Sequence, residues 1–283
     1  MKKALLSALA ICMICLASCN KDKDSNNGGT PGGAQTIGAR LSAIWDESVY
    51  YQEESYDNGV TWVTTQTMYN EKYKKESWTW NGNKPSSFTI CEGIGYGSFT
   101  DDYIYDDNNK LVKFLEEGYI YEISYTGDRI SSIRTDDGSL DVSYSNNKIK
   151  KIEGIMDEEY FGVNFYWNGD NLSKLTISDD DENEIDWIAR FNSYDNGKNP
   201  YCDFNATLFY LFSWGLDDMG YKLSANNCTS LDYDEGPITI EYSYNSKQYP
   251  TKAIRTHISN SDNYGGTLHR TRTVTTYTYE YLD

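Results

Sequence analysis

Basic residues and histidines are scarce in this chain of 283 residues. It has 25 lysines and arginines against 43 aspartates and glutamates, which makes a formal net charge of −18 at pH 7. Binding to nucleic acid or directly to anionic headgroups needs basic patches, so neither is an expected partner. The only histidines, His257 and His269, have no cysteine nearby. We therefore expect surface histidines, with no metal site and no cofactor.

Motifs of the common enzyme classes are also missing. There is no nucleophile elbow, HExxH helix, phosphate-binding loop or EF-hand loop. The glycine-rich stretch 93–97 lacks a strand–helix setting, so we interpret it as a turn. The acidic run 179–184 lacks the glycine turn of a calcium loop, and we prefer a solvated hairpin tip to a calcium site. No catalytic residue is predicted, and a non-enzymatic role is preferred.

The beginning of the chain has the composition of an export signal. Two lysines precede an uncharged apolar run, residues 4–16, that is too short to cross a bilayer as a helix. The segment ends in Leu-Ala-Ser-Cys at 16–19, which resembles the bacterial lipobox. This resemblance implies cleavage before Cys19 and lipid on its sulfur and amine, and two or more acyl chains make a stable anchor. We expect a signal peptide at 1–18 and a membrane anchor at Cys19.

A polar tether and one folded domain follow the lipobox. Glycine, asparagine, serine and charged residues dominate 19–35, and such a segment is flexible. We assign 36–283 to a single domain. Of its cysteines, Cys91, Cys202 and Cys228, at most two can pair. Buried free thiols are the preferred interpretation, and a Cys202–Cys228 bridge is the alternative.

A short pattern recurs along the domain: alternating aromatic and polar residues, then Tyr or Trp, a turn, a Lys or Arg, and an apolar pair three apart. The aromatic before the turn falls at Trp80, Tyr105, Tyr125, Tyr144, Trp167, Tyr194 and Tyr244. Most repeats are 19–27 residues long, as two strands and two tight turns require. The last gap is 50 residues and indicates an insertion, which we place at about 203–232. The repeat predicts an antiparallel meander of hairpins.

Alternation with period two is clear in the incoming strands, for example in 119–125, 161–167 and 238–244. One face is aromatic and is expected to be buried, while the other is largely polar. Turns such as Asn146-Asn147 carry residues that tolerate positive φ, as tight hairpins need. In the outgoing strands, apolar pairs such as Ile130 and Ile133 imply either a turn residue or a β-bulge.

The predicted fold class is all-β, an antiparallel meander of repeated hairpins with one short helical insert. Strands near 39–46, 49–56 and 60–70 precede the repeats, which gives about fourteen to seventeen strands. Residues 207–216 are apolar on nearly every side, and we interpret 205–222 as a short buried helix or a packed loop. A barrel of this size leaves a lumen that side chains alone do not fill. The sheet is therefore a plugged barrel or a strongly curled sheet, and we prefer the barrel.

Aromatic residues number 42, which makes a platform for sugar rings conceivable. Most lie on the face that the register needs buried, so we expect Trp78, Trp80 and Trp167 in the core. Only the off-pattern aromatics are weak ligand candidates. These are Trp62, Tyr166, Trp187 and Trp214.

The lipobox, the tether, the Tyr-x-x-x-Lys/Arg-Ile/Leu hairpins, the Lys-Asn-Pro at 198–200 and the closing YTYEY resemble a family of Bacteroidetes-type lipoproteins of unknown function with a porin-like domain. The resemblance implies a barrel-like fold and an envelope address, on the periplasmic side of the outer membrane or at the cell surface. It implies no catalytic residues. A membrane channel is disfavoured because the face opposite the aromatics is polar rather than lipid-facing.

Two hypotheses about function remain. The preferred one is a lipid-anchored, non-enzymatic binding or structural module whose partner is a glycan or a surface protein. The alternative is a polysaccharide hydrolase, which needs a carboxylate pair in the barrel mouth. The sequence predicts neither a ligand site nor an oligomeric state.

Overall fold

The computed structural model describes residues 40–282 except 92, 96, 117, 157, 180–182, 204–219, 234 and 260. The described residues form 18 strands and two short 3-10 turns in the order β1 (Arg40–Ser55), β2 (Val63–Tyr69), β3 (Tyr73–Asn81), β4 (Lys84–Cys91), β5 (Ser98–Tyr105), β6 (Leu111–Glu116), β7 (Tyr119–Thr126), β8 (Arg129–Thr135), β9 (Gly138–Ser145), β10 (Lys148–Met156), β11 (Glu159–Asn168), β12 (Asn171–Ser178), β13 (Glu184–Lys198), η2 (Pro200–Asp203), η3 (Gly220–Leu223), β14 (Asn226–Tyr233), β15 (Gly236–Tyr244), β16 (Pro250–Ile258), β17 (Asp262–Tyr264) and β18 (Thr267–Leu282). The predicted signal peptide, Cys19 and the tether lie outside these residues.

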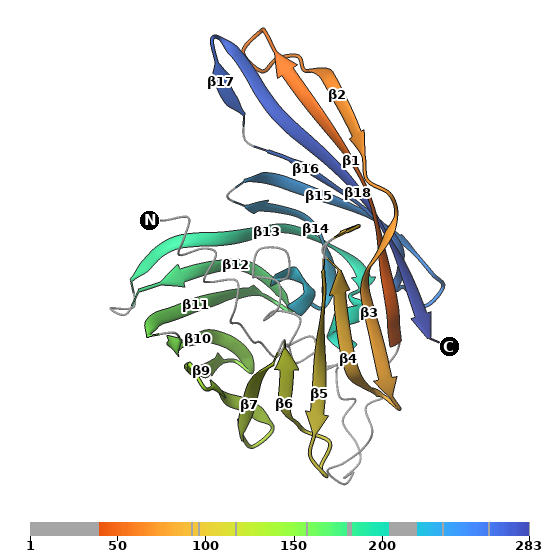
Figure 1. Ribbon diagram of the computed structural model, residues 1–283. Helices are drawn as coiled ribbons and strands as arrows, with labels where there is room; N and C mark the ends of the chain where they lie inside the picture. Colours follow the sequence, from red (N-terminus) through yellow and green to blue (C-terminus); the bar gives the residue numbers. More distant parts are fainter. Residues whose placement is uncertain are drawn as a thin grey trace.

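Sixteen of the strands close into an antiparallel barrel (Figure 1). Consecutive strands from β3 to β16 pair with one another. The first and last strands, β1 and β18, pair with each other over their whole lengths. β1 also pairs with β3, and β18 with β16. This closure leaves no open edge along the barrel wall. The predicted all-β meander is confirmed, and the sheet is a closed barrel rather than an open curled sheet.

The two faces of the wall differ as the alternation predicts. The lumen side is filled by apolar side chains, including Trp78, Phe88, Phe114, Phe165 and Leu175, each at most 4% exposed. Along β7, inward Tyr121 and Ile123 are buried while outward Glu122 and Ser124 are exposed. The outer surface is therefore polar along these strands, and the apolar core lies inside the barrel. None of the described residues forms a helix with the length and apolarity that crossing a membrane requires.

A β-bulge after the tight turn explains the apolar pairs three apart. In the β7–β8 hairpin, Tyr125 pairs with Ile130 and Ser124 with Ser132, so Ser131 is the extra residue. Both isoleucines, Ile130 and Ile133, are then 1% exposed. The same register shift follows the turns of β3–β4, β5–β6, β9–β10, β11–β12 and β15–β16. The bulge therefore settles the alternative that the sequence left open.

The residues of the repeat form a lateral latch between neighbouring hairpins. In five repeats, the aromatic before the turn donates a hydrogen bond to a backbone carbonyl of the preceding hairpin or strand, and Tyr281 near the end of β18 does the same. These bonds are Trp80 Nε1 to Leu41 O (2.8 Å), Tyr105 Oη to Pro85 O (2.9 Å), Tyr125 Oη to Leu111 O (2.8 Å), Trp167 Nε1 to Ile149 O (2.7 Å), Tyr194 Oη to Leu172 O (2.6 Å) and Tyr281 Oη to Pro250 O (2.8 Å).

In four hairpins, a cation after the turn completes this latch. Lys110 lies over the ring of Tyr125 at 5.1 Å and donates to Gly127 O at 2.5 Å, on the next turn. Lys84, Arg129 and Lys148 lie over the aromatic of the next hairpin at 5.0 to 5.4 Å. The recurring aromatic and cation therefore hold adjacent turns together. We call the end of the barrel with these turns the latch rim.

The described ends of the segment between β13 and β14, residues 199–203 and 220–225, contact β3 inside the barrel. Tyr201 donates from Oη to Glu76 Oε2 at 2.9 Å, and Lys222 Nζ lies 3.0 Å from Glu76 Oε1. All three side chains are buried. Residues 226–232, which the sequence placed in the insert, belong to β14. Most of the predicted helix at 205–222 lies outside the described residues.

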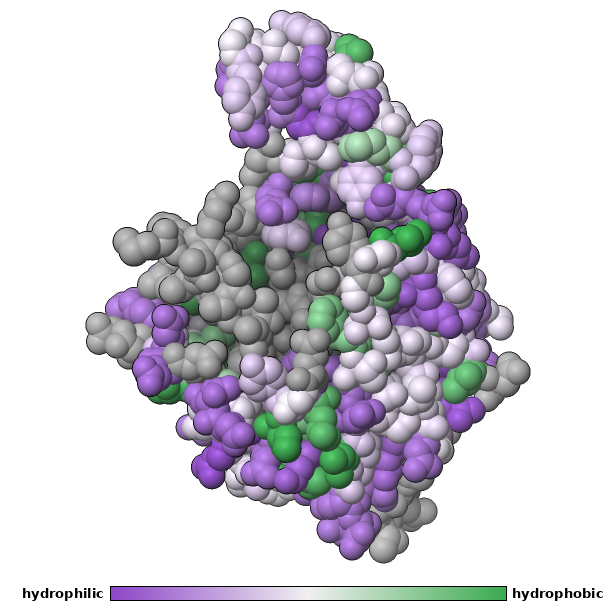
Figure 2. All heavy atoms as spheres, in the orientation of Figure 1, coloured by the Kyte–Doolittle hydropathy of each residue, from purple (hydrophilic) through white to green (hydrophobic). Residues whose placement is uncertain are grey.

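At the opposite end, four strand segments leave the barrel as a flap (Figures 1 and 2). The flap consists of residues 49–69 and 262–272, in the strand order β2-β1-β18-β17. β1 is one continuous strand of 16 residues. The prediction of two separate strands at 39–46 and 49–56 is therefore wrong. β1 continues beyond the rim, where β18 pairs with it as far as Ser55 and Leu268.

Candidate functional site: the flap

The tip of the flap is a turn built by local hydrogen bonds. Asn58 and Gly59 adopt positive φ values of 57° and 86°, which those residue types tolerate. Asp57 accepts bonds from the Thr61 hydroxyl (2.5 Å) and backbone N–H (2.8 Å), and from the Ser55 hydroxyl (2.8 Å). The bonds from Thr61, followed by that from Ser55, lower the pKa of Asp57 to about 2. The tip therefore keeps one defined conformation.

A charged cluster lies on the face of the flap that continues the outside of the barrel. Glu53 Oε1 accepts a hydrogen bond from Arg272 Nε and Oε2 one from Arg270 Nε, both at 2.8 Å. The guanidinium of Arg270 lies 3.9 Å from the centre of the Trp62 ring, and that of Arg272 lies 3.9 Å from the Tyr51 ring. Burial raises the pKa of Glu53, but the bonds from the two arginines outweigh it and hold the pKa below its usual value.

The other face of the flap continues the lumen side and is hollowed by a recess of about 320 Å³. Gln52, Glu54 and His269 line this recess, together with Asp262 and Tyr264 of β17. His269 Nδ1 lies 3.6 Å from Glu54 Oε1. The recess is open and polar, and its lining offers hydrogen-bonding groups rather than an apolar pocket.

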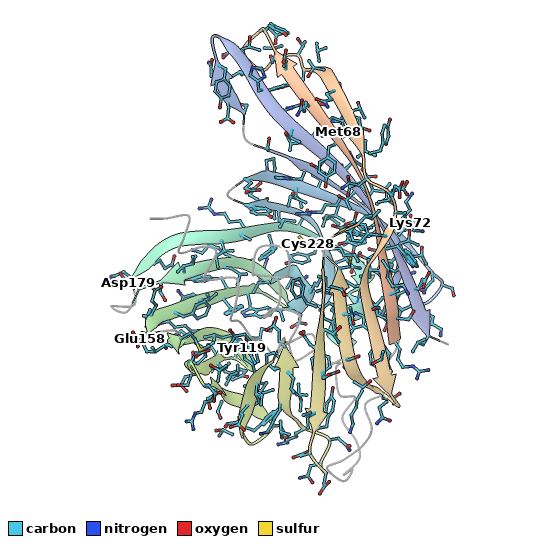
Figure 3. The ribbon with its side chains drawn as sticks, in the orientation of Figure 1. Met68, Lys72, Tyr119, Glu158, Asp179 and Cys228 are labelled. Carbon is cyan, nitrogen blue, oxygen red and sulfur yellow. The ribbon has the colours of Figure 1, made fainter. Side chains whose placement is uncertain are left out.

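Exposed apolar and aromatic side chains are concentrated on the flap. Six of the thirteen large hydrophobic side chains that are exposed among the described residues belong to it. They are Tyr56, Val60, Val63, Met68, Tyr69 and Tyr264, between 42% and 80% exposed. Figure 3 labels Met68 on this projection, above the end of the barrel. Exposed apolar side chains gathered in one place are typical of an interaction surface.

The outer strand of the flap, β2, is exposed along its whole length. All seven of its residues are exposed, and it pairs with β1 alone among the described strands. Its sequence, VTTQTMY, has no charge and no proline, the residues that usually protect an edge. A bulge at Thr65 is the one irregularity. Barrel closure needs neither β2 nor β17, so the flap is available for another role.

Beneath the flap, the lumen contains the buried carboxyl group of Asp46. Burial raises its pKa, against the opposing effects of Lys75, Ser48 and Arg255. A hydrolytic pair needs a second carboxyl group at this position. The charged groups that lower the pKa of Asp46 are the cations Lys75, at 3.8 Å, and Arg255. Asp46 therefore forms an ion pair with Lys75.

The off-pattern aromatics are only partly available to a ligand. Trp62 is half-buried, with Arg270 over its ring and its Nε1 donating to Gly59 O at 3.1 Å. Tyr166 is 38% exposed, but Lys174 lies 4.4 Å from its ring centre. The Trp187 side chain and all of Trp214 lie outside the described residues. Trp78, Trp80 and Trp167 pack in or against the core, as predicted.

His257 lies on β16, whereas the described ends of the acidic run lie at the β12–β13 connection. His257 is half-buried and stacks on Tyr233 at 5.9 Å, so its prediction as a surface residue is wrong. At the ends of the acidic run, Asp179 accepts bonds from Asn183, and Glu184 from Lys174. Residues 180–182 lie outside the described part. Within the described part of the chain, no three His, Cys, Asp or Glu side chains are grouped to hold a metal ion.

Two of the cysteines can be placed. Cys228 is a free, fully buried thiol, and Cys91 is a free, half-buried one. Burial raises the pKa of the Cys228 thiol to about 12, which makes it unreactive near neutral pH. The alternative of a Cys202–Cys228 bridge is therefore wrong.

The cluster of Glu53, Arg270 and Arg272 was not predicted from the sequence. Its only local signal is the Arg-x-Arg at 270–272, which places two cations on one face of a strand. Their partner Glu53 is 217 and 219 residues away. Nothing in the local pattern connects these positions.

Comparisons with known proteins gave a similar solved structure and no matching family. No protein-family model and no curated protein matches the chain. A crystal structure of a porin-like protein from Bacteroides uniformis is similar over 83% of this chain and 97% of that one. The identity is 13% and the TM-score 0.49. That similarity concerns overall shape, and no functional statement follows from it.

Proposed function

We propose that this chain is a cell-envelope protein of the outer membrane, anchored by lipid at Cys19, that binds a glycan through the flap and is not an enzyme. The concentration of exposed apolar and aromatic side chains on the flap carries the proposal. These side chains project from a scaffold whose own core is closed without them. A rigid barrel that presents a small projecting sheet is suited to binding.

The direction of β1 supports a flap held away from the membrane. Arg40, at the start of β1, lies at the latch rim and donates to Gly82 O at 3.3 Å. Ser55, at the end of the strand, lies in the flap. Sixteen residues of strand span roughly 50 Å at about 3.3 Å per residue. A lipid at Cys19 is joined to the chain on the side of Arg40, so the flap is the end that reaches outward.

A glycan microarray tests the binding role. The full chain, with Cys19→Ser to keep it lipid-free, is compared with a flap variant, Val63→Thr/Met68→Thr/Tyr69→Thr. The matched control, Ile104→Thr/Ile120→Thr/Ile155→Thr, removes three exposed hydrophobic residues from the barrel wall. We expect the flap variant to bind at least tenfold more weakly and the control to bind normally. Equal binding by the flap variant would remove the flap from the proposal, and no binding by the parent chain would contradict the glycan role.

The anchor is tested independently of the ligand. Cells that express the chain are fed labelled palmitate, and label is expected in the parent chain and absent after Cys19→Ser. In membrane fractionation, the labelled parent chain should be found with the membranes and the Cys19→Ser variant should not. Label that persists in the serine variant would show that Cys19 is not the lipidated residue.

A further inference from the structure

The outer face of the flap holds two arginines side by side. Arg270 and Arg272 are two residues apart on β18, so their side chains share a face about 7 Å apart. A single carboxylate, Glu53, bridges them with one oxygen to each Nε, at 2.8 Å. The bridging side chain is 6% exposed, while the two arginines are 21% and 29% exposed. The buried group is therefore the carboxylate, and the guanidinium groups lie nearer to the solvent.

Most donors of the two arginines remain available. A guanidinium has five N–H groups, and one of each is used by Glu53. No described residue accepts a hydrogen bond from the Nη atoms of either arginine. The rings of Trp62 and Tyr51 lie 3.9 Å from the two guanidiniums and restrict their rotation. The donors are thus preorganised before any ligand arrives.

Charge on this face is opposite to that of the whole protein. By strand pairing, the face carries Thr64, Thr67, Tyr69, Val49, Tyr51, Glu53, Ser55, Asn263, Leu268, Arg270, Arg272 and Val274. Two cations against one carboxylate leave it with a net charge of +1, whereas the chain as a whole has −18. The nearby Asp57 at the tip is held by its own loop through Thr61 and Ser55. The arginine pair is a local cationic site.

We propose that Arg270 and Arg272 bind the carboxylate groups of an acidic polysaccharide, an inference that rests on the proposed glycan-binding function. The guanidinium fork matches a carboxylate and makes two parallel hydrogen bonds to it. Around the pair, Thr64, Thr67 and Tyr51 offer hydroxyl groups, which suit the hydroxyl groups of sugar units. The exposed strands of the flap form an extended surface along which a chain of sugars can lie. An acidic peptide is the competing ligand that the experiment separates.

Affinity electrophoresis of the full Cys19→Ser chain tests this site. Polygalacturonate in the gel supplies carboxylates on a polysaccharide, dextran supplies a neutral one, and polyglutamate supplies carboxylates on a peptide. We expect retardation by polygalacturonate alone, weakening as salt is added. Arg270→Gln/Arg272→Gln should weaken it at least tenfold. Arg134→Gln, an exposed arginine on the barrel wall, is the matched control and should change nothing.

A second pair of variants keeps both arginines in place, because removing them also frees Glu53. Thr64 is exposed and pairs with Glu53 across β1 and β2. Thr64→Glu should weaken binding to polygalacturonate at least fivefold, and Thr64→Lys should strengthen it. A purely structural role for the arginines predicts that the two variants bind alike, which would overturn the site.

The remaining outcomes separate this inference from the proposed function. Binding of a neutral glycan that depends on Val63, Met68 and Tyr69 but not on the charge variants overturns the arginine site and leaves the function standing. Equal retardation by polyglutamate overturns the assignment to a polysaccharide. No retardation by any polysaccharide, with a blank microarray, contradicts both.

Discussion

Glu76 of β3 and Lys222 of η3 form an ion pair of 3.0 Å inside the barrel, with side chains 3% and 6% exposed. The two residues are 146 positions apart. Their contact joins the segment between β13 and β14 to the opposite part of the wall. Tyr201 donates a hydrogen bond to the same carboxylate at 2.9 Å. Glu76 therefore binds one residue from each described end of the segment, Tyr201 and Lys222.

Glu76→Gln is expected to lower the free energy of unfolding by about 3–5 kcal/mol, because it leaves the Lys222 ammonium group buried without its anion. Urea denaturation measures this change. Replacing both partners, as Glu76→Leu/Lys222→Met, should restore much of the loss, since no charge then remains buried. The control Glu122→Gln breaks an exposed pair with Lys113 (2.6 Å) and should leave the midpoint unchanged. If Glu76→Gln and the control change the unfolding free energy equally, the buried ion pair between Glu76 and Lys222 does not stabilise the fold.

Tyr125→Phe tests the latch. The change removes the hydrogen bond from Tyr125 Oη to Leu111 O while keeping the ring beneath Lys110. We expect a loss of about 0.5–1.5 kcal/mol in unfolding free energy. Tyr119→Phe is the matched control, because that tyrosine is 54% exposed. If Tyr125→Phe is as stable as Tyr119→Phe, the hydrogen bond from Tyr125 to Leu111 O does not contribute to stability.

Deletion of Ser131 tests the β-bulge. Without the extra residue, Ile130 and Ile133 are two positions apart, so a regular strand keeps both on the inner face. The deletion should therefore cost less than the about 1.5–3 kcal/mol that exposing one such side chain costs. Ser131→Ala keeps the residue count and should behave as the parent chain in thermal unfolding. A loss of about 1.5–3 kcal/mol in the deletion variant would show that the bulge itself is needed to keep both isoleucines in the core.

Glu53 predicts a specific dependence of stability on pH. Its pKa in the folded protein lies below the unfolded value, so its carboxylate stabilises the fold above the unfolded pKa of about 4.5. This contribution is lost as the pH falls through the folded pKa. Melting temperatures of the parent chain and of Glu53→Gln are compared from pH 7 to pH 3. The parent should be more stable at pH 7, and the difference should shrink below about pH 4.5. A constant difference would mean that ionisation of Glu53 is not linked to folding.

Hairpins and faces were predictable because their causes are local. The alternation of Phe161, Val163 and Phe165 places three apolar side chains on one face, and all three are buried. Asn146 and Asn147 adopt φ values of 51° and 65°, as the tight turn requires. The sequence also predicted the aromatic and cation of the repeat as a recurring pattern. It did not predict their contact, because each pair belongs to two different hairpins.

Other features depend on where distant strands meet. Trp45 Nε1 donates to Glu280 Oε1 at 2.8 Å across 235 residues, on the pair of strands that closes the barrel. The continuity of β1 through Glu47 and Ser48 depends on β18, which pairs with it over its whole length. The joining of Glu53 to Arg270 and Arg272 likewise requires β1 and β18 to be neighbours.

The sequence by itself determined the hairpin repeat, the buried face of each strand and the turns, since period-two alternation and positive φ act over a few residues. The tertiary structure alone decided the closure of sixteen strands, the flap beyond the rim, the lumen pair of Glu76 and Lys222 and the arginine site. Each of these depends on the accumulated twist and stagger of the whole sheet, which bring residues more than a hundred positions apart into contact.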